Sequence, residues 1–305
     1  MVTRKRGAAI PLGLLLAPLL AQAQQELPLY AGEIPNSIAA PDEEATRDPN
    51  EPHLFRLNVS RPTITLHQPR SRDSKRAAVI ILPGGTYRGV SIVKEGHDVA
   101  RAFNELGVTA LVLKYRTPSE RHMVDKARGP LQDAQQALRV VRDRADEWRI
   151  DRNRIGIVGF SAGGHLAATA ATQFDQPVLR PDFLILVYPV ISFTDELANK
   201  GSRQQLLGAT PAPDLIKRYS NELNVTAHTP PTFLVHAADD TAVPVGNSMR
   251  FAEALHAHHV AVELIVYPSG GHGFGLNNAT TRDRWIDRCA QWLESQGWTS
   301  GERSN

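Results

Sequence analysis

Apolar runs of five to seven residues recur along the chain with little alternation. Such runs predict strands that are buried on both faces, as in a parallel sheet, because a strand with one wet face would alternate with polar residues. They occupy Ala77–Leu82, Val108–Leu113, Arg154–Phe160, Phe183–Tyr188, Thr232–His236 and Val262–Tyr267. An earlier stretch, Leu57–His67, shows partial alternation and predicts antiparallel edge strands.

Between these runs, apolar residues recur every three or four positions, as they do along one face of a helix. The longest stripe consists of Leu131, Ala134, Leu138, Val141, Ala145 and Trp148. Helices are predicted near Glu95–Leu106, Val124–Trp148, from Ser161 onward, Asn247–His258 and Arg282–Glu294. Alternation of strand and helix at this spacing predicts an α/β fold with a mostly parallel central sheet and helices on both faces.

Two segments break this rhythm. Residues 24–56 are rich in Pro, Glu, Asp and Asn without periodicity, and are interpreted as an extended N-terminal lead-in to a domain over 57–297. Residues 190–229 mix Gly, Pro and Asn with short helical segments near Asp195–Asn199 and Pro213–Tyr219. An irregular insertion of this length inside a compact domain is usually functional, so it predicts a small cap over a site; a surface excursion is the alternative.

The first 23 residues have the pattern of a secretory signal peptide. Arg4, Lys5 and Arg6 precede an apolar stretch over 8–20 and a small-residue cleavage signal over 21–23. The apolar stretch is short for a membrane span, although an uncleaved anchor is the alternative. The pattern predicts a secreted or periplasmic protein.

Charge and cysteine content narrow the function classes. Cleavage after Ala23 leaves 31 basic residues against 32 acidic ones, so nucleic acid is not an indicated partner, and neither is a membrane after cleavage. Cys289 is the one cysteine, which excludes a disulfide within the chain. It shares a helical face with Trp285 and Trp292, which favours a place in the core over a role as nucleophile.

The clearest chemical motif is Gly159-Phe160-Ser161-Ala162-Gly163. It fits the G-x-S-x-G pattern in which a strand turns at once into a helix and exposes a serine at the sheet's edge. A strand precedes it here and a small-residue helix follows. Ser161 is therefore the predicted nucleophile.

Two further side chains follow other strands of the predicted sheet. The carboxyl ends of parallel strands meet at one edge, where sites form. His272 stands among glycines after the last strand and is the predicted base. Asp239 and Asp240 both follow the strand Thr232–His236. The spacing His-small-x-x-Asp-x-x-Val-Pro selects Asp240 as the partner of the histidine. Asp239 remains the alternative, or is a solvated turn residue.

A glycine pair follows the first buried strand, in Pro83-Gly84-Gly85-Thr86-Tyr87. Consecutive glycines let backbone N–H groups turn toward a developing negative charge. The predicted oxyanion hole consists of the N–H groups of Gly85, Thr86 and Ala162. The esterase pattern at this loop is His-Gly-Gly-Gly, from which Pro83 and Thr86 depart.

Other polar residues carry weaker signals. Tyr87, Glu95 and His97 follow the glycine loop and are predicted to line the substrate pocket. His165, four residues past Ser161, is predicted to pack or to support the site indirectly. The remaining predictions are a solvated helix face at Asp133 and a polar helix end, not a metal site, at His256, His258 and His259. No metal or organic cofactor is expected.

With Ser161, Asp240 and His272 in this order along the chain, the sequence resembles the α/β-hydrolase superfamily. Four motifs narrow the resemblance: Leu82–Tyr87, Lys94–His97, Leu113–Arg116 and Gly159–His165. The superfamily resemblance extends over residues 57–297, and the four motifs are similar to those of secreted bacterial esterases that include acetylxylan and feruloyl esterases. The resemblance implies a serine esterase that removes short acyl groups, most commonly acetyl, from a plant polysaccharide or oligosaccharide such as acetylated xylan.

Three alternatives remain open at this point. A general short-chain carboxylesterase would share every motif. A serine peptidase of the prolyl-oligopeptidase type ordinarily carries a propeller ahead of the hydrolase domain, for which residues 24–56 are too few. A non-catalytic carbohydrate-binding relative would be expected to lack one of Ser161, Asp240 and His272, and all three are present. The sequence does not indicate an oligomeric state.

Overall fold

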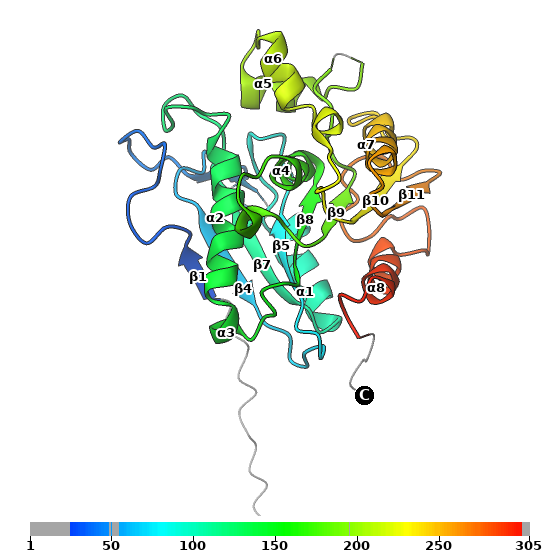
Figure 1. Ribbon diagram of the computed structural model, residues 1–305. Coiled ribbons are helices and arrows are strands. Elements are labelled where there is room, and N and C mark those ends of the chain that lie inside the picture. Colours follow the sequence, from blue (N-terminus) through cyan, green and yellow to red (C-terminus); the bar gives the residue numbers. More distant parts are fainter. Residues whose placement is uncertain (1–24, 49, 51–54, 195, 301–305) are drawn as a thin grey trace, which may run out of the picture.

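The computed structural model describes residues 25–48, 50, 55–194 and 196–300, so the signal peptide predicted over 1–23 lies outside the described residues. Within them, one eight-stranded sheet runs through the molecule in the order β1-β4-β7-β5-β8-β9-β10-β11 (Figure 1). The strands are β1 (Gln25–Pro28), β4 (Thr63–His67), β7 (Thr109–Lys114), β5 (Ala78–Leu82), β8 (Ile155–Phe160), β9 (Leu184–Val187), β10 (Thr232–Ala237) and β11 (Val262–Tyr267).

The six strands from β7 to β11 in the sheet order pair in parallel, and β4 pairs antiparallel with β7. Every residue of β5, β8, β9 and β10 is buried, which explains their continuous apolar runs. The predicted α/β class with a mostly parallel sheet is confirmed.

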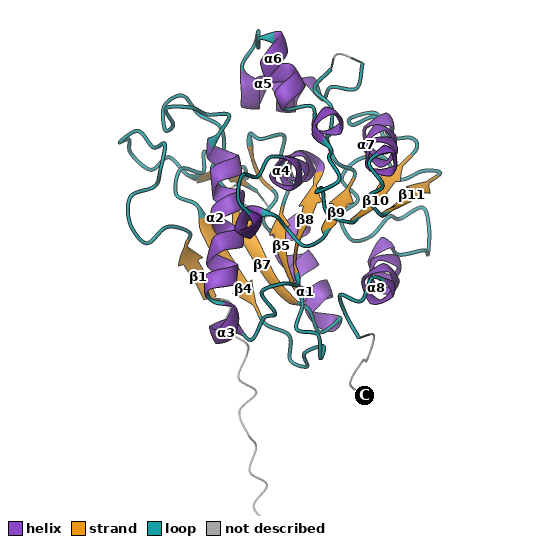
Figure 2. Cartoon of the chain, viewed as in Figure 1, coloured by secondary structure: helices purple, strands orange, loops and turns teal. Residues whose placement is uncertain are grey.

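Helices cover both faces of the sheet (Figures 1 and 2). One face carries α2 (Gly129–Asp143), α4 (Ser161–Thr172) and α7 (Gly246–Ala257), and the other carries α1 (Asp98–Glu105) and α8 (Trp285–Ser295). Cys289 on α8 is fully buried, as predicted, and burial raises the pKa of its thiol.

Two predicted helices have different bounds in the structure. The helix predicted from Val124 begins at Gly129, because Pro130 has no N–H to donate and is tolerated only in a helix's first turn. It ends at Asp143, and α3 (Ala145–Trp148) follows as a separate turn. The helix predicted from Glu95 is a π-helical turn, η1 (Val93–His97), followed by α1.

The predicted lead-in contributes to the sheets. Gln25–Pro28 pairs antiparallel with β4 and forms an edge of the main sheet. A small second sheet joins β2 (Ala45–Thr46), β3 (Arg56–Leu57) and β6 (Gly89–Val90). Such short edge strands are held largely by backbone hydrogen bonds, so they need no apolar run that a sequence pattern would reveal.

The insertion over 190–229 contains α5 (Lys200–Leu207), α6 (Pro213–Arg218) and the 3-10 turn η3 (Asn221–Asn224). Figure 1 shows α5 and α6 at the top, beyond the edge where the parallel strands end. The helical segment predicted near Asp195–Asn199 lies just before the helix α5 that the structure shows. The side chain of Asn199 accepts a hydrogen bond from the Ser202 N–H and caps α5, so the helix starts after this residue.

The prediction that Asp133 lies on a solvated helix face is wrong. Asp133 and Arg116 are both fully buried, and the carboxylate accepts bonds from Nη2 of Arg116 at 2.8 Å and from the hydroxyl of Tyr30 at 2.9 Å. Burial raises the pKa of Asp133, and Arg116 opposes that rise. Helical periodicity could not identify this partner, because Arg116 comes from the end of β7, 17 residues earlier.

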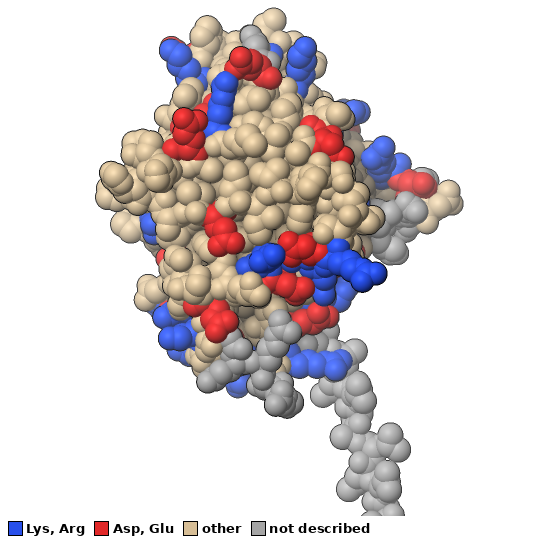
Figure 3. Space-filling model, turned by 90° about the vertical axis from the view of Figure 1, so that its right-hand side faces the viewer, with Lys and Arg blue, Asp and Glu red and all other residues tan. Residues whose placement is uncertain are grey.

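On the side where the sheet ends at β11, much of the visible surface is uncharged, and several charged side chains gather low on this face (Figure 3). Met249 on α7 and Val266 on β11 are exposed large apolar residues, at 48% and 37%. Across the part of the chain that the structure describes, we find no helix with the length and apolar character needed to cross a membrane.

Candidate active site

Ser161 occupies the sharp turn between β8 and α4. Its φ of +51° lies in the left-handed region, which is strained for a residue with a side chain. The flanking glycines make the turn possible: a Cβ on Gly159 would come within 2.5 Å of the Gly163 carbonyl oxygen, and one on Gly163 would overlap the Leu82 carbonyl oxygen. The backbone at this turn therefore has the conformation that the G-x-S-x-G motif predicts.

The structure brings the three predicted catalytic residues together from three strand ends. The Oγ of Ser161 lies 2.8 Å from Nε2 of His272, and Nδ1 of His272 lies 2.7 Å from Oδ2 of Asp240. Because a carboxylate only accepts hydrogen bonds, Nδ1 is the donor and Nε2 is left to accept the serine proton. Ser161 is 8% exposed and the side chain of His272 is 25% exposed. Of these two residues, His272 is therefore the more accessible to solvent.

Asp240 is held as an ionised carboxylate. Its Oδ1 accepts the N–H groups of Ala242 and Val243, at 2.9 and 2.8 Å. Burial by itself would raise the pKa of Asp240, but hydrogen bonds from His236, His272 and Val243 hold that pKa below its ordinary value. The charge on Asp240 can therefore orient the imidazole of His272 and stabilise its protonated form.

His236 is a site residue to which sequence reasoning assigned no role. Its Nε2 donates to the carbonyl oxygen of Val243 at 2.9 Å and lies 3.2 Å from Oδ2 of Asp240, while Nδ1 lies 2.8 Å from the Ser248 hydroxyl. It thereby ties the turn that carries Asp240 to β10 and α7. Its place in the His-Ala-Ala-Asp-Asp run, at the end of a predicted strand, was the available signal.

Asp239 does not contact the imidazole. Its Oδ1 accepts the N–H of Gly271 at 2.8 Å, so this carboxylate supports the loop beside His272. Of the two adjacent aspartates, Asp240 is the one that contacts His272, as the motif spacing predicts.

The loop over 270–275 carries His272 in an unusual backbone conformation. Its four glycines all have positive φ, from 60° to 150°. Three side chains hold alternate positions: Asp239 accepts from Gly271, Lys94 Nζ donates to the Gly273 carbonyl at 2.6 Å, and the Tyr188 hydroxyl accepts from Gly275 at 2.9 Å. The glycines give the loop its path, and these contacts keep the imidazole in place.

The glycine loop after β5 turns back toward Ser161. Gly85 has a φ of +145° and Thr86 one of +58°, and a Cβ on Gly85 would overlap the Gly89 carbonyl oxygen. The N–H of Gly84 donates to Oε2 of Glu95 at 2.8 Å and is thereby occupied. Ala162 lies in the first turn of α4, where N–H groups have no acceptor within the helix. This arrangement is compatible with the predicted oxyanion hole of Gly85, Thr86 and Ala162.

The structure corrects the predicted pocket role of Tyr87. Its side chain is 1% exposed, and its hydroxyl lies 2.8 Å from Nδ1 of His165, so it packs inside the protein. The physical reason is the φ of +58° at Tyr87, which turns the chain there. His165 packs as predicted: Nε2 donates to the Tyr219 carbonyl, the ring stacks on Phe193, and burial lowers its pKa to about 4.

Glu95 is likewise buried, at 6% exposure, with both oxygens occupied by protein donors. The structure thus places it beneath the glycine loop, and not on a surface that a substrate could touch. One of its donors, Tyr188, is a second residue that sequence reasoning missed. Its position at the end of a predicted strand was the signal that could have identified it.

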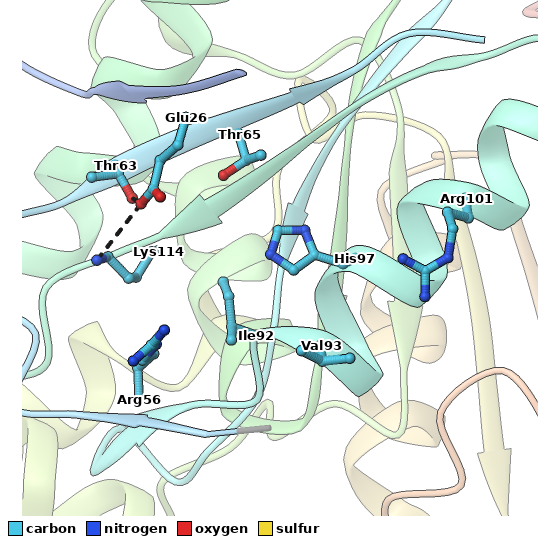
Figure 4. Close-up of a pocket in the computed structure, with 9 residues that line it drawn as sticks. All are labelled: Glu26, Arg56, Thr63, Thr65, Ile92, Val93, His97, Arg101 and Lys114. Atoms are coloured by element: carbon cyan, nitrogen blue, oxygen red, sulfur yellow. Dashed lines mark hydrogen bonds and ion pairs between the residues drawn. The ribbon is translucent and has the colours of Figure 1, made fainter. Parts of the chain in front are cut away.

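His97 faces a different cavity. Its Nδ1 lies 2.9 Å from Nε2 of His67 on β4, because the π-helical turn directs it toward the antiparallel end of the sheet. It lines a pocket of about 300 Å³ together with Glu26, Arg56, Thr63, Thr65, Ile92, Val93, Arg101 and Lys114 (Figure 4). None of Ser161, Asp240 and His272 lines this pocket, so the predicted substrate contact of His97 is not supported.

In the described ranges, no three His, Cys, Asp or Glu side chains come together as a group that could hold a metal ion. His256, His258 and His259 are exposed at the end of α7.

A mostly parallel eight-stranded sheet with Ser161, Asp240 and His272 at its strand ends, in this chain order, defines an α/β-hydrolase. Within that class, the model of the BD-FAE family matches residues 64–255. The protein belongs to the BD-FAE family.

Relatives agree with this assignment. An acetylxylan esterase of Xylanibacter ruminicola is 37% identical over 223 residues, which cover 72% of this chain and 45% of the relative. An endo-1,4-beta-xylanase B of Butyrivibrio fibrisolvens is 34% identical over 242 residues, covering 76% and 36%. The chain thus spans less than half the length of these two curated relatives.

Solved structures are similar over most of their length. An acetyl ester-xyloside bifunctional hydrolase from Caldicellulosiruptor lactoaceticus has a TM-score of 0.72 and 36% identity, over 90% of this chain and 97% of that one. A sugar hydrolase from Lactococcus lactis has a TM-score of 0.66 and 30% identity, over 79% and 96%.

Proposed function

We propose that this protein is an exported serine esterase that removes acetyl groups from xylan or xylo-oligosaccharides. The observation that carries the proposal is the continuous chain of contacts from Ser161 through His272 to Asp240, at 2.8 and 2.7 Å. This geometry is that of a nucleophile, its general base and an orienting acid. No metal or organic cofactor takes part in the proposed reaction.

In the first half-reaction, Ser161 Oγ attacks the ester carbonyl carbon while Nε2 of His272 takes its proton. Asp240 stabilises the imidazolium that forms and keeps the ring in the required tautomer. Nε2 then returns the proton to the sugar oxygen, which leaves as an alcohol, and the acyl group stays on Ser161. In the second half-reaction water takes the place of the alcohol, and the carboxylic acid is released.

The oxyanion of each tetrahedral intermediate is proposed to accept bonds from the N–H groups of Gly85, Thr86 and Ala162. Gly84 is excluded from that role because its N–H already donates to Glu95. Each donor in such a site typically contributes about 100- to 1000-fold to the rate.

The substrate is proposed from the relatives, whose names refer to acetylxylan, xylanase and acetyl ester-xyloside hydrolysis. We propose that the insertion over 190–229 forms a cap that contributes to substrate specificity. A Cβ on Gly201 in α5 would come within 2.9 Å of Cγ2 of Thr86, so this helix lies against the proposed oxyanion loop. A bulky acyl group would compete with α5 for that space.

A panel of substrates tests the proposal. Initial rates would be compared on p-nitrophenyl acetate, butyrate and octanoate, acetylated xylan, a feruloyl ester and a proline peptide. We expect acetyl release from xylan and preference for the shortest p-nitrophenyl ester. Equal rates on the whole ester series without xylan deacetylation would favour a general short-chain carboxylesterase, and cleavage of the peptide would favour the peptidase alternative.

Ser161→Ala tests the nucleophile and should lower kcat by about a millionfold. Retention of a tenth of the activity would contradict the mechanism. Labelling of the wild-type protein by a fluorophosphonate, and its absence in Ser161→Ala, separates a serine hydrolase from a non-catalytic binding protein.

Export is part of the proposal and rests on the pattern of residues 1–23. Expression of the full chain in a bacterium, followed by fractionation and N-terminal sequencing, tests it. A mature N-terminus at Gln24 in the periplasm or medium is expected. Uncleaved protein in the cytosol or membrane would contradict it.

A further inference from the structure

Glu95 is a buried carboxylate whose hydrogen bonds go to residues other than Ser161, His272 and Asp240. Both of its oxygens are nevertheless occupied by groups that belong to that site. Oε2 accepts the N–H of Gly84 at 2.8 Å, and Oε1 accepts the hydroxyl of Tyr188 at 2.7 Å. A buried charge is costly unless it is paired, so these partners are what keeps the group in place.

The first contact reaches the glycine loop. Gly84 lies between Glu95 and the nucleophile, because a Cβ there would be 2.8 Å from Oε2 of Glu95 and 2.8 Å from Cβ of Ser161. The loop has a second anchor at Pro83, whose carbonyl accepts the hydroxyl of Tyr115 at 2.7 Å. The carboxylate therefore fixes the loop one residue before the proposed oxyanion donor Gly85.

The second contact reaches the histidine loop. The Tyr188 hydroxyl donates to Glu95 and accepts the N–H of Gly275 at 2.9 Å, three residues after His272. The ring of Tyr188 also packs edge-on against the imidazole of His272, with centroids 4.9 Å apart. One buried carboxylate is thus connected to the loops on both sides of the serine.

Both oxygens of Glu95 serve as hydrogen-bond acceptors in this network. Burial raises the pKa of Glu95, and bonds from Tyr188 and Gly84, with the nearby His272, oppose that rise. Both oxygens face donors, and the Tyr188 hydroxyl already has a donor partner in Gly275. An amide in place of the carboxylate would direct N–H groups at one of these donors and leave it without an acceptor.

We propose that Glu95 is a positioning residue for acyl transfer, which holds the glycine loop through Gly84 and the histidine loop through Tyr188. This inference rests on the proposed function, because it concerns the same Ser161 site. Both loops must hold their reacting groups within a fraction of an ångström, so loosening either one lowers the rate of the bound substrate's reaction more than its binding.

Two variants remove the connections separately. Glu95→Gln keeps the shape but lacks an acceptor for one donor, and Tyr188→Phe keeps the ring against His272 but lacks the hydroxyl. We expect each to lower kcat on p-nitrophenyl acetate by about 10- to 100-fold with KM within about threefold of wild type. The kcat of the double variant should lie within about threefold of the kcat of the less active single variant, because both substitutions break the same connection.

The matched control is Asp73→Asn. Asp73 is also buried, and accepts backbone N–H groups of Lys75 and Ser300, each at 2.8 Å, at the opposite end of β5. It should lose stability without a change in kcat per active site, counted by titration with a fluorophosphonate.

The outcomes separate the inference from the function on which it depends. If Ser161→Ala retains activity, the proposed function fails. If Ser161→Ala is inactive while Glu95→Gln and Tyr188→Phe show wild-type kcat per titrated site, the function stands and the positioning role is wrong. A loss of melting temperature in Glu95→Gln with unchanged kcat per site would also overturn it, because that pattern describes a structural residue. Multiplied losses in the double variant would contradict the shared connection.

Discussion

Nε2 of His165 donates a hydrogen bond to the carbonyl oxygen of Tyr219, at 2.8 Å and across 54 residues of sequence. Its other nitrogen accepts from Tyr87 at the same distance. A neutral imidazole thereby joins helix α4, which begins at Ser161, to the glycine loop and to the insertion over 190–229. A protonated ring would lose its acceptor, so this junction makes the fold sensitive to acid.

The stability of the protein should therefore fall as the pH falls from about 6.5 to 4. Burial lowers the pKa of His165 to about 4, whereas an unfolded histidine titrates near 6.5. Between these values unfolding takes up a proton, so stability rises with pH by about 1.4 kcal/mol per pH unit for this group and levels off above 6.5. His67, with its pKa lowered by burial to about 4, adds to the same trend.

Urea unfolding of wild type and His165→Phe at pH 4.5, 5.5, 6.5 and 7.5 measures the contribution. The variant should be less stable at pH 7.5. Between pH 4 and 6.5 its free energy of unfolding should depend less steeply on pH, because its unfolding takes up about one proton fewer than that of wild type. The exposed His258→Gln serves as control and should keep the wild-type slope. An unchanged slope in His165→Phe would contradict the assignment of a neutral buried ring.

Asp240→Asn should lower kcat by about 10,000-fold without unfolding the protein. The amide would present N–H to Nδ1 of His272 and favour the tautomer in which Nε2 carries the proton and cannot accept it from Ser161. The measurement is kcat on p-nitrophenyl acetate at pH 7.5. Asp239→Asn keeps an acceptor for the N–H of Gly271, so its kcat should fall less than about tenfold. A larger loss of kcat in Asp239→Asn than in Asp240→Asn would mean that Asp239 is the partner of the histidine.

Ionised Asp240 should also stabilise the fold. Its pKa is depressed in the folded protein, so its contribution is complete above the ordinary aspartate value of about 3.9 and is lost as the pH falls toward the folded value. Above pH 5 it stays charged. Any change of kcat/KM between pH 5 and 8 should therefore come from a group other than Asp240, and a rate that followed the protonation of Asp240 in that range would contradict its depressed pKa.

Gly163→Ala should impair both folding and catalysis. The added Cβ would overlap the Leu82 carbonyl oxygen, at the point where β5 leads into the glycine loop. Forcing α4 away from β5 should cost about 1–3 kcal/mol and displace Ser161 from the loop donors. Melting temperature and kcat test this, with Gly32→Ala as the control, since no atom of the residues that the structure describes lies within 4 Å of a Cβ there. A fully active, equally stable Gly163→Ala would show that the close approach is not required.

Asp133→Ala should lower the free energy of unfolding by about 3–5 kcal/mol, because it leaves the fully buried Arg116 without its counter-charge. Chemical denaturation measures the loss. Asp146→Ala, which removes an exposed partner of Arg152, should leave stability nearly unchanged. Similar small effects in both variants would mean that the Arg116–Asp133 pair does not hold α2 to the end of β7.

The sequence by itself determined the order of the parallel strands, the helices that follow them, and the identity of the residues at the strand ends. The reason is local: a parallel strand buried on both faces must be apolar throughout, and a strand that turns at once into a helix needs glycines beside its exposed serine. Ser161, Asp240 and His272 could be chosen in this way without coordinates, and the structure brings them within hydrogen-bond distance of one another.

Only the tertiary structure decided which polar side chains are partners. Glu95, Tyr87 and His97 follow the glycine loop within 12 residues, yet they point to Tyr188, His165 and His67 from three other elements. Asp133 finds Arg116 inside the protein for the same reason. A side chain's local pattern gives its burial at best, whereas its partner depends on which distant segment the fold brings against it.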